Sequence, residues 1–178
     1  MDLKTVLVVC NGNIHRSVIA EFCLNKALEE MNLSKRLIAI SRGLQGTLGT
    51  ALPRGRNLCD YPLEWSLSSP VLDEIGIDIS SHCVTLIDIS VVEKASLILA
   101  MDRAVLVGKS NSLFRQFSKY SYKMRLFREL EGRPEDVPDC FGSSDATLHR
   151  HVIRLISTIS KGRIDALIAY TGLFEGFR

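Results

Sequence analysis

The chain has 178 residues, of which 46% are hydrophobic and 24% charged, and its formal net charge is +2. These values are typical of a soluble globular protein, and they exclude an intrinsically disordered or collagen-like chain. The near-neutral charge disfavours nucleic acid as a partner. No apolar run approaches the roughly 18 residues of a membrane span, and no signal-peptide pattern is present, so we expect a cytoplasmic protein with no membrane span.

Strand and helix patterns alternate along the chain. Residues 4–9 form a run that is apolar from Val6 onward, which predicts a strand buried on both faces that ends at Cys10. A helical pattern follows the Asn-Gly-Asn loop and extends to Met31. The further expected elements are strands at 37–41, 96–101 and 123–127, and helices at 69–75 and 145–160. We predict that residues 43–67 form a long loop and that residues 162–178 form a final helix or a loose end.

This alternation predicts an α/β fold with a parallel sheet covered by helices on both faces. We expect one domain over residues 1–178, with its core at about 3–160. In such sheets, ligands bind beyond the carboxyl ends of the strands, and Cys10 would lie at that edge.

The five cysteines indicate no disulfide framework, because their number is odd and no two form a Cys-x-x-Cys pair. The same spacing disfavours a structural zinc site, and we expect neither a metal nor a cofactor. The cysteines are Cys10, Cys23, Cys59, Cys83 and Cys140.

The most informative segment places a cysteine five residues before an Arg-Ser pair, at the junction of a strand and a helix. It reads Cys10-Asn11-Gly12-Asn13-Ile14-His15-Arg16-Ser17. A loop in this position can turn its backbone N–H groups inward to bind an anion, and the following helix adds the positive end of its dipole. Arg16 provides a planar guanidinium that can bind two phosphate oxygens. The segment therefore predicts a phosphate-binding loop over residues 11–17.

The same positive surroundings favour the thiolate of Cys10, which is the nucleophilic form. We predict that Cys10 attacks phosphorus to give a phosphocysteine, which water then hydrolyses. Arg16 and the loop amides would stabilise the equatorial oxygens in both steps, and Ser17 would donate its hydroxyl to the sulfur.

These residues resemble the low-molecular-weight protein tyrosine phosphatase family. The family signature, Cys-x-Gly-Asn-x-Cys-Arg-Ser, is matched by Cys10, Gly12, Asn13, Arg16 and Ser17. The resemblance extends over roughly residues 3–160, and its further matches are Ser41-Arg42-Gly43, the segment 76–80 with His82, Met101-Asp102 and Val137-Pro138-Asp139. It implies a three-layer, four-stranded parallel sheet with flavodoxin-like winding.

The resemblance also implies roles for residues outside the loop. Asp139 matches the family's general acid, which protonates the leaving phenolate, and Asp136 is a nearby rival. Asn13, Ser17, Ser41 and His82 would form a network that supports the phosphate loop.

The chain departs from the family pattern at several positions. His15 replaces the second loop cysteine, and it could add a cation near the anion or face away. Cys140 replaces the proline after the acid, which predicts a less rigid acid loop, and Phe141 replaces the first of two tyrosines. The aromatic wall of the cleft could come from Trp65, Tyr61 or Leu44.

The expected substrate is a tyrosine-phosphorylated protein, with a tyrosine kinase as one candidate. Ile14 favours phosphotyrosine, because arginine-phosphate phosphatases of this family usually carry threonine there. An arsenate reductase is disfavoured, because its resolving cysteines are absent from the Met101-Asp102-Arg103 segment. A non-catalytic module that binds phosphotyrosine is the remaining alternative.

Overall fold

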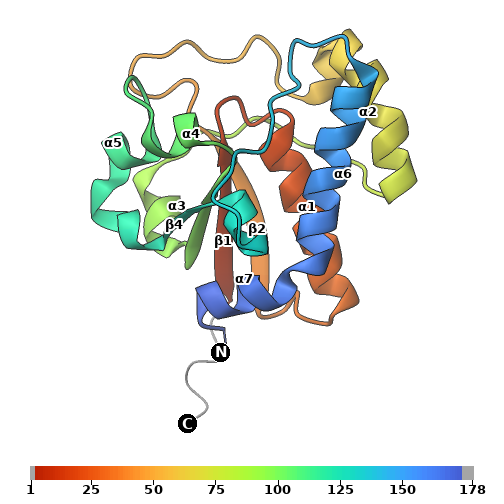
Figure 1. The fold of residues 1–178 in the computed structure, drawn as a ribbon. Coiled ribbons are helices and arrows are strands. Elements are labelled where there is room, and N and C mark those ends of the chain that lie inside the picture. Colours follow the sequence, from red (N-terminus) through yellow and green to blue (C-terminus); the bar gives the residue numbers. More distant parts are fainter. Residues whose placement is uncertain (1–2, 174–178) are drawn as a thin grey trace.

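The first strand, β1, lies at the centre of a four-stranded parallel sheet in the computed structural model, which describes residues 3–173 (Figure 1). The strands are β1 (Lys4–Cys10), β2 (Leu37–Gly43), β3 (Leu97–Ala100) and β4 (Met124–Leu126). Their order is β2-β1-β3-β4, and all pairs are parallel. The sheet confirms the expected fold class, and Cys10 ends β1 opposite Gly43, the last residue of β2.

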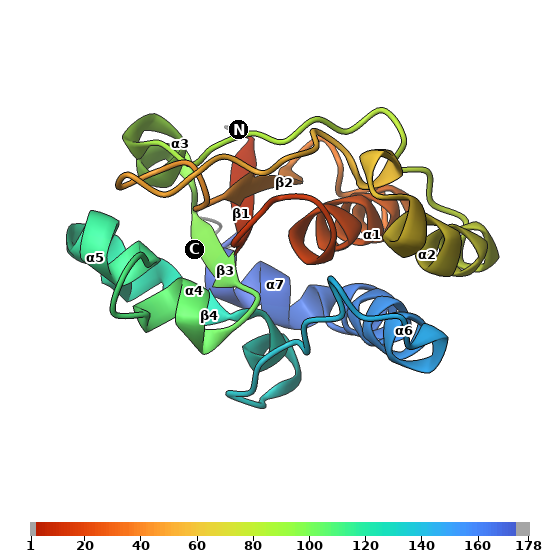
Figure 2. The ribbon, with the colours of Figure 1, turned by 90° about the horizontal axis from the view of Figure 1, so that it is seen from above.

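Helices cover both faces of the sheet because successive residues of β1 point to opposite sides. Val6 and Val8 belong to the core under α1, α2, α6 and α7, whereas Leu7 and Val9 belong to the core under α3, α4 and α5 (Figure 2). The helices are α1 (Arg16–Glu30), α2 (Pro62–Ile75), α3 (Ile89–Lys94), α4 (Arg103–Val107), α5 (Leu113–Phe117), α6 (Ala146–Gly162) and α7 (Ile164–Thr171). Three 3₁₀ helices complete the order: η1 (Leu58–Asp60), η2 (Ser118–Lys123) and η3 (Phe127–Glu131).

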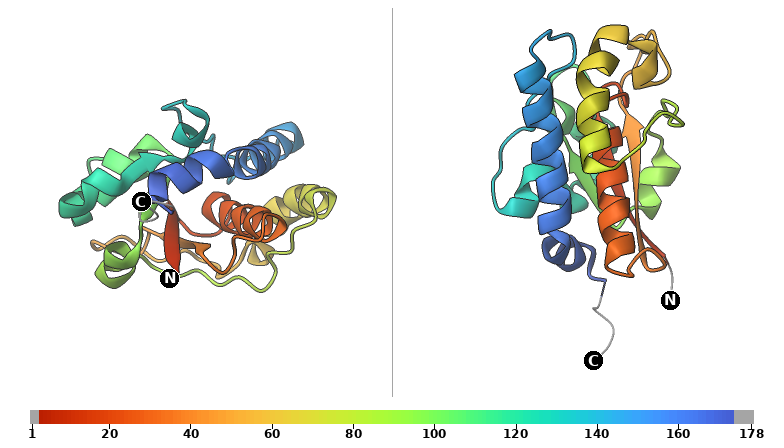
Figure 3. Two further views of the ribbon diagram at one scale, coloured as in Figure 1. Left: turned by 90° about the horizontal axis from the view of Figure 1, so that it is seen from below. Right: turned by 90° about the vertical axis from the view of Figure 1, so that its right-hand side faces the viewer.

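The expectation of an irregular loop over residues 43–67 is wrong in its second half. Helix α2 begins at Pro62 rather than at residue 69, so that Pro70 lies inside it. A proline interrupts the hydrogen bonding of a helix interior, which is why Pro70 resembles a helix start in the sequence. The helix continues past Pro70 because Val71 and Leu72 are buried in the core, where α2 packs along α6 (Figure 3).

The C-terminal segment forms a helix as far as it is described. Helix α7 ends at Thr171 and is followed by Gly172, which has the left-handed conformation typical of a helix C-cap. Lys4 Nζ donates to the carbonyls of Thr171 and Gly172, at 2.6 and 2.7 Å, and thus ties this helix to the start of β1. The part of our expectation that concerns residues 174–178 lies outside the described residues. Within residues 3–173, no helix is long and apolar enough to cross a membrane.

Candidate active site

The loop between β1 and α1 encloses the sulfur of Cys10. The backbone N–H of Asn13 donates to Cys10 Sγ at 3.2 Å, and Ser17 Oγ lies 3.0 Å from the same sulfur. Asn13 has a φ of 54°, a left-handed conformation that asparagine tolerates better than most residues, and this turn directs its N–H toward the sulfur. The loop and the first turn of α1 thus place a backbone N–H and a hydroxyl against one buried thiol.

The side chain of Asn13 holds this loop in place through its amide. Asn13 Oδ1 accepts from the backbone N–H of Thr85 at 2.9 Å, and His82 Nε2 lies 3.2 Å from the same oxygen. Asn13 Nδ2 donates to Ser41 Oγ at 2.8 Å and to Ser17 Oγ at 3.2 Å. The structure therefore brings together the four residues that the family resemblance assigns to a supporting network. Burial lowers the pKa of His82.

The donor and acceptor of each hydrogen bond in this network can be assigned, starting from the carboxylate of Glu21. Ser41 Oγ donates to Glu21 Oε2 at 2.5 Å, so Ser41 accepts from Asn13. Ser17 also accepts from Asn13, which leaves its own hydroxyl proton free to point at Cys10 Sγ. Gly43 lies against this loop, where a Cβ atom would be 3.0 Å from Asn13 Cβ. A larger residue at this position would push against the backbone of the loop, so glycine favours the close approach of β2 and the loop.

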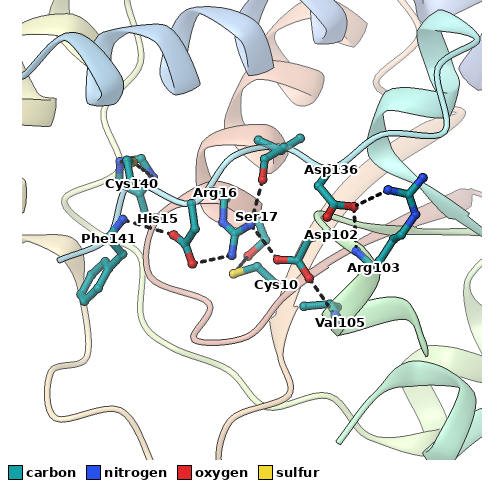
Figure 4. A network of polar contacts seen from close by, with 12 residues as sticks. Cys10, His15, Arg16, Ser17, Asp102, Arg103, Val105, Asp136, Cys140 and Phe141 are labelled. Carbon is teal, nitrogen blue, oxygen red and sulfur yellow. Dashed lines mark hydrogen bonds and ion pairs between the residues drawn. The ribbon is translucent and has the colours of Figure 1, made fainter. Parts of the chain in front are cut away.

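Arg16 lies between two carboxylates at the mouth of the loop. Its Nη1 donates to Asp102 Oδ2 at 2.7 Å and to the carbonyl of Val137 at 3.0 Å, while Nη2 donates to Asp139 Oδ2 at 2.9 Å. Figure 4 shows the guanidinium beside Asp102 and above Cys10. Burial by itself lowers the pKa of Arg16, but the charges of Asp139 and Asp102 raise it above its usual value. The guanidinium is therefore charged and fixed in orientation.

The two candidate acids point in different directions. Asp139 lines the pocket together with Cys10 and Arg16, and its side chain is 57% exposed. Asp136 instead accepts from the backbone N–H of Arg103 at 2.9 Å (Figure 4). This geometry favours Asp139 as the residue that can reach a leaving group bound above the sulfur.

The pocket above Cys10 has one aromatic corner. Tyr61 and Phe141 line it and form an edge-to-face pair, with ring centroids 4.8 Å apart. Trp65 packs against the hydrophobic core, and Leu44 is buried in the core on the other side of the sheet. Of the three residues suggested for the wall, Tyr61 is the one that lines the pocket. The full lining comprises Cys10, Asn11, Gly12, Ile14, His15, Arg16, Gln45, Pro53, Arg54, Tyr61, Asp139 and Phe141.

His15 does not act as a cation at this site. Burial, with smaller contributions from His149 and Arg16, lowers its pKa to about 3, so the ring is neutral at ordinary pH. Its Nε2 lies 3.1 Å from Ser68 Oγ, and the thiol of Cys140 lies 3.8 Å from each ring nitrogen. Of the two alternatives for His15, a cation near the anion or a ring that faces away, the structure supports the second, because the fold buries the imidazole between α2 and α6.

One group of side chains among the described residues could hold a metal ion. The donor atoms of His15, Cys140 and His149 lie within 4.8 Å of one another, and all three residues are buried. Burial, and next the charge of Asp139, raise the pKa of Cys140 to about 12, so this cysteine is a neutral thiol. The nitrogen and sulfur atoms of this three-residue group are of the types that zinc prefers as ligands.

The sequence patterns did not assign a role to several residues of this site. Asp102 lies in a segment that matches the family, but nothing in the sequence connects it with Arg16. Ser68 and His149 have no local motif, and their signal is only that each is polar at a buried position of its helix.

Comparisons with known proteins point to one family. The family model described as "Low molecular weight phosphotyrosine protein phosphatase" matches residues 5–169. The chain is 30% identical over 103 residues to "Low molecular weight protein-tyrosine-phosphatase Ptp" of Acinetobacter johnsonii, a match that covers 58% of this chain. That match spans 60% of the relative's own length.

Solved structures show the same fold. A low molecular weight protein tyrosine phosphatase from T. tengcongensis is 26% identical, with a TM-score of 0.67 over 93% of this chain and 98% of that one. The YwlE arginine phosphatase from Geobacillus stearothermophilus is 21% identical, with a TM-score of 0.72 over 97% of each chain. At that identity the second likeness supports the fold alone.

Proposed function

Because the chain belongs to the low molecular weight phosphotyrosine protein phosphatase family, we propose that it is a cysteine-dependent phosphatase that hydrolyses phosphotyrosine in proteins. The observation that carries the proposal is the position of Cys10 Sγ, which lies within 3.2 Å of two hydrogen-bond donors in the pocket that Arg16 and Asp139 also line. We further propose that the protein acts in the cytoplasm on a tyrosine-phosphorylated protein, of which a tyrosine kinase is one candidate.

In the first step, Cys10 Sγ attacks the phosphorus atom in line with the P–O bond of the substrate. The S–P bond forms as the P–O bond breaks. Asp139 enters this step as the protonated acid, after its contact with Arg16 is released, and gives its proton to the departing phenolate. The backbone N–H of Asn13 and the hydroxyl of Ser17 stabilise the thiolate before attack. Arg16 turns from its contact with Asp139 to the phosphoryl oxygens while Asp102 keeps its other edge fixed.

In the second step, water hydrolyses the phosphocysteine. Asp139, now deprotonated, accepts a proton from the water as the water oxygen attacks phosphorus. The S–P bond breaks and the Ser17 hydroxyl hydrogen-bonds to the leaving sulfur of Cys10, which is 3.0 Å away in the resting site. Inorganic phosphate leaves, and Cys10 returns to its thiolate form.

The walls of the pocket support an aromatic substrate. Ile14, Tyr61 and Phe141 give the side of the pocket an apolar and aromatic surface against which a phenyl ring can pack. Phe141 is 40% exposed and is therefore accessible to a substrate ring. This lining favours phosphotyrosine over an aliphatic phosphoester.

The test is hydrolysis of para-nitrophenyl phosphate and of a phosphotyrosine peptide with EDTA present. We expect turnover in the parent protein, loss of turnover in Cys10→Ser, and a decrease of about a hundredfold or more in Asp139→Asn. A phosphoarginine peptide in the same assay tests the substrate class, and preferential turnover of that peptide would contradict it. Phosphotyrosine binding without turnover by the folded parent would favour the non-catalytic module, and arsenate reduction would favour the reductase.

A further inference from the structure

A chain of buried polar groups connects the phosphate loop with the acid loop. Two of its members, His15 and Cys140, are positions where the sequence departs from the family pattern, and the structure places them in contact. The five groups come from the N-cap of α1, from α2, from α6 and from the loop that follows Asp139. We call this set the histidine relay: Cys140, His15, Ser68, His149 and the backbone carbonyl of Ser143.

The carbonyl of Ser143, at one end of the relay, determines which nitrogen of His149 carries a proton. His149 Nε2 lies 3.0 Å from the carbonyl oxygen of Ser143, and a carbonyl can only accept, so Nε2 is the protonated nitrogen of the ring. In a neutral ring Nδ1 then carries a lone pair. It accepts the hydroxyl proton of Ser68, whose Oγ is 3.2 Å away.

The near end of the relay follows from the same reasoning. Ser68 has used its only proton, so its oxygen accepts from His15 Nε2 at 3.1 Å. The neutral ring of His15 then has a lone pair on Nδ1. The sulfur of Cys140 lies 3.8 Å from both ring nitrogens, and of the two only Nδ1 can accept the thiol proton. All bonds of the relay therefore point in one direction, from Cys140 to the carbonyl of Ser143. Because each ring nitrogen has a partner, the group is complete without a metal ion.

The relay begins and ends on the segment that carries Asp139. Cys140 follows the acid directly, and Ser143 lies three residues further along. On the other side of Asp139, the backbone N–H of Val137 donates to the carbonyl of Met101 at 2.8 Å, and the carbonyl of Val137 accepts from Arg16 Nη1 at 3.0 Å. The chain is thus held in place on both sides of Asp139, although the side chain of Asp139 is itself largely exposed.

We infer that the histidine relay positions the general acid: it takes the place of a rigid proline after Asp139 by clamping the acid loop onto the phosphate loop. This inference rests on the proposed function. The side-chain hydrogen bonds of the relay involve neither Cys10 nor Arg16, so its members are positioning residues that act through Asp139.

The test uses Ser68→Ala, which removes the middle of the relay, with Ser66→Ala as the matched control. Ser66 is an exposed serine on the same helix. Cys140→Ala removes the first donor, and Cys140→Ser keeps a donor for His15. Inorganic phosphate as a competitive inhibitor reports whether each variant keeps an intact phosphate loop, and EDTA keeps metal ions out of the relay.

The readout is kcat/KM for two aryl phosphates, because this constant covers the steps up to departure of the leaving group. With phenyl phosphate, a poor leaving group, we expect Ser68→Ala and Cys140→Ala to lose about tenfold, a fraction of the general-acid contribution. With 2,4-dinitrophenyl phosphate, which hardly needs an acid, we expect less than a twofold loss. Ser66→Ala and Cys140→Ser should stay within about twofold of the parent on both substrates.

A second comparison tests whether the relay acts through the acid. In an Asp139→Asn background, Ser68→Ala should cost nothing further on phenyl phosphate, because the group that it positions can no longer donate a proton. An equal loss on both substrates, no loss on either, or full additivity with Asp139→Asn would overturn the inference.

Nitrogen NMR of the histidine rings examines the relay without any activity. We expect the Nε2–H tautomer for both His15 and His149, and a changed signal for both rings in Ser68→Ala but not in Ser66→Ala. An Nδ1–H tautomer at either ring would overturn the inference even in an active enzyme. A folded parent without turnover but with both expected tautomers would instead contradict the proposed function.

Discussion

Asp102 holds two different groups with its two oxygens, and this separates its effect on catalysis from its effect on stability. Oδ2 accepts from Arg16 Nη1 at 2.7 Å, and Oδ1 accepts from the backbone N–H of Val105 at 2.8 Å, which caps α4. Asp102→Asn keeps one oxygen for the cap but loses the negative charge beside the guanidinium. Asp102→Ala loses both interactions.

The expected magnitudes follow from these two bonds. A hydrogen bond to a charged group contributes about 1.5–3 kcal/mol, which corresponds to roughly a tenfold to hundredfold change in rate if it is needed in the transition state. The side chain of Asp102 is only 16% exposed, so water does not replace the lost partner well. We therefore expect kcat/KM for para-nitrophenyl phosphate to fall about tenfold to a hundredfold in both variants. Loss of the cap should cost about 1 kcal/mol of unfolding free energy in Asp102→Ala, but little in Asp102→Asn.

Steady-state kinetics and urea unfolding of the three proteins give both quantities. An Asp102→Asn protein within twofold of the parent in kcat/KM would refute the idea that this carboxylate orients Arg16. An Asp102→Asn protein as unstable as Asp102→Ala would refute the assignment of Oδ1 to the cap.

Three further predictions concern the thiols, the pH dependence and helix α2. Iodoacetamide at pH 8 should alkylate the exposed Cys83 long before Cys140, because the thiol of Cys140 is buried and has a pKa of about 12. Peptide mass spectrometry measures the order of alkylation, and equal rates at the two cysteines would contradict the prediction. The folded pKa of His15 is about 3 and its unfolded value about 6.5, so the unfolded chain binds more protons below pH 6.5, and stability falls as the pH drops. At pH 5 this single group should lower the free energy of unfolding by about 2 kcal/mol relative to pH 8. Urea unfolding with EDTA present measures this difference. A pH-independent stability in the parent, or an equally steep pH dependence in His15→Gln, would contradict the prediction. Pro70→Ala restores a backbone donor inside α2 and should raise the free energy of unfolding by up to about 3 kcal/mol. A free energy of unfolding below that of the parent, again from urea unfolding, would mean that the proline ring itself packs favourably.

The two central strands could be predicted because each contains a short, continuous apolar run. The run at 4–9 corresponds to β1 (Lys4–Cys10), and the run at 96–101 contains β3 (Leu97–Ala100). Such runs are a local signal, since a strand buried on both faces needs an apolar residue at every position. Helices α3, α4 and α5 have only five or six residues each, too few for a helical period to be visible.

Helix α2 shows how tertiary packing overrides a local signal. Pro70 marks a helix start by the usual preference, but the buried residues around it keep the helix intact. The stability that comes from packing against α6 is a property of the assembled fold, and no local pattern around Pro70 contains it.

The candidate site was predictable where its residues are neighbours in the sequence. Cys10 and Arg16 lie in one loop, so their spacing is itself the signal. The partners of Arg16 come from distant segments, and Asp102 was matched to the family without its role being apparent. The charge of His15 could not be read from the sequence at all, because burial by α2 and α6 decides it.

The central claim is that Cys10 forms a covalent phosphoenzyme. Its most direct test is to mix the protein with a phosphotyrosine peptide, quench with acid within the first turnover, and map phosphate by peptide mass spectrometry. The account predicts phosphate on Cys10 in the parent and a larger amount in a variant with slowed hydrolysis of the intermediate, with none in Cys10→Ser. Turnover of the peptide without phosphate on Cys10, or with phosphate on another residue, would contradict the account.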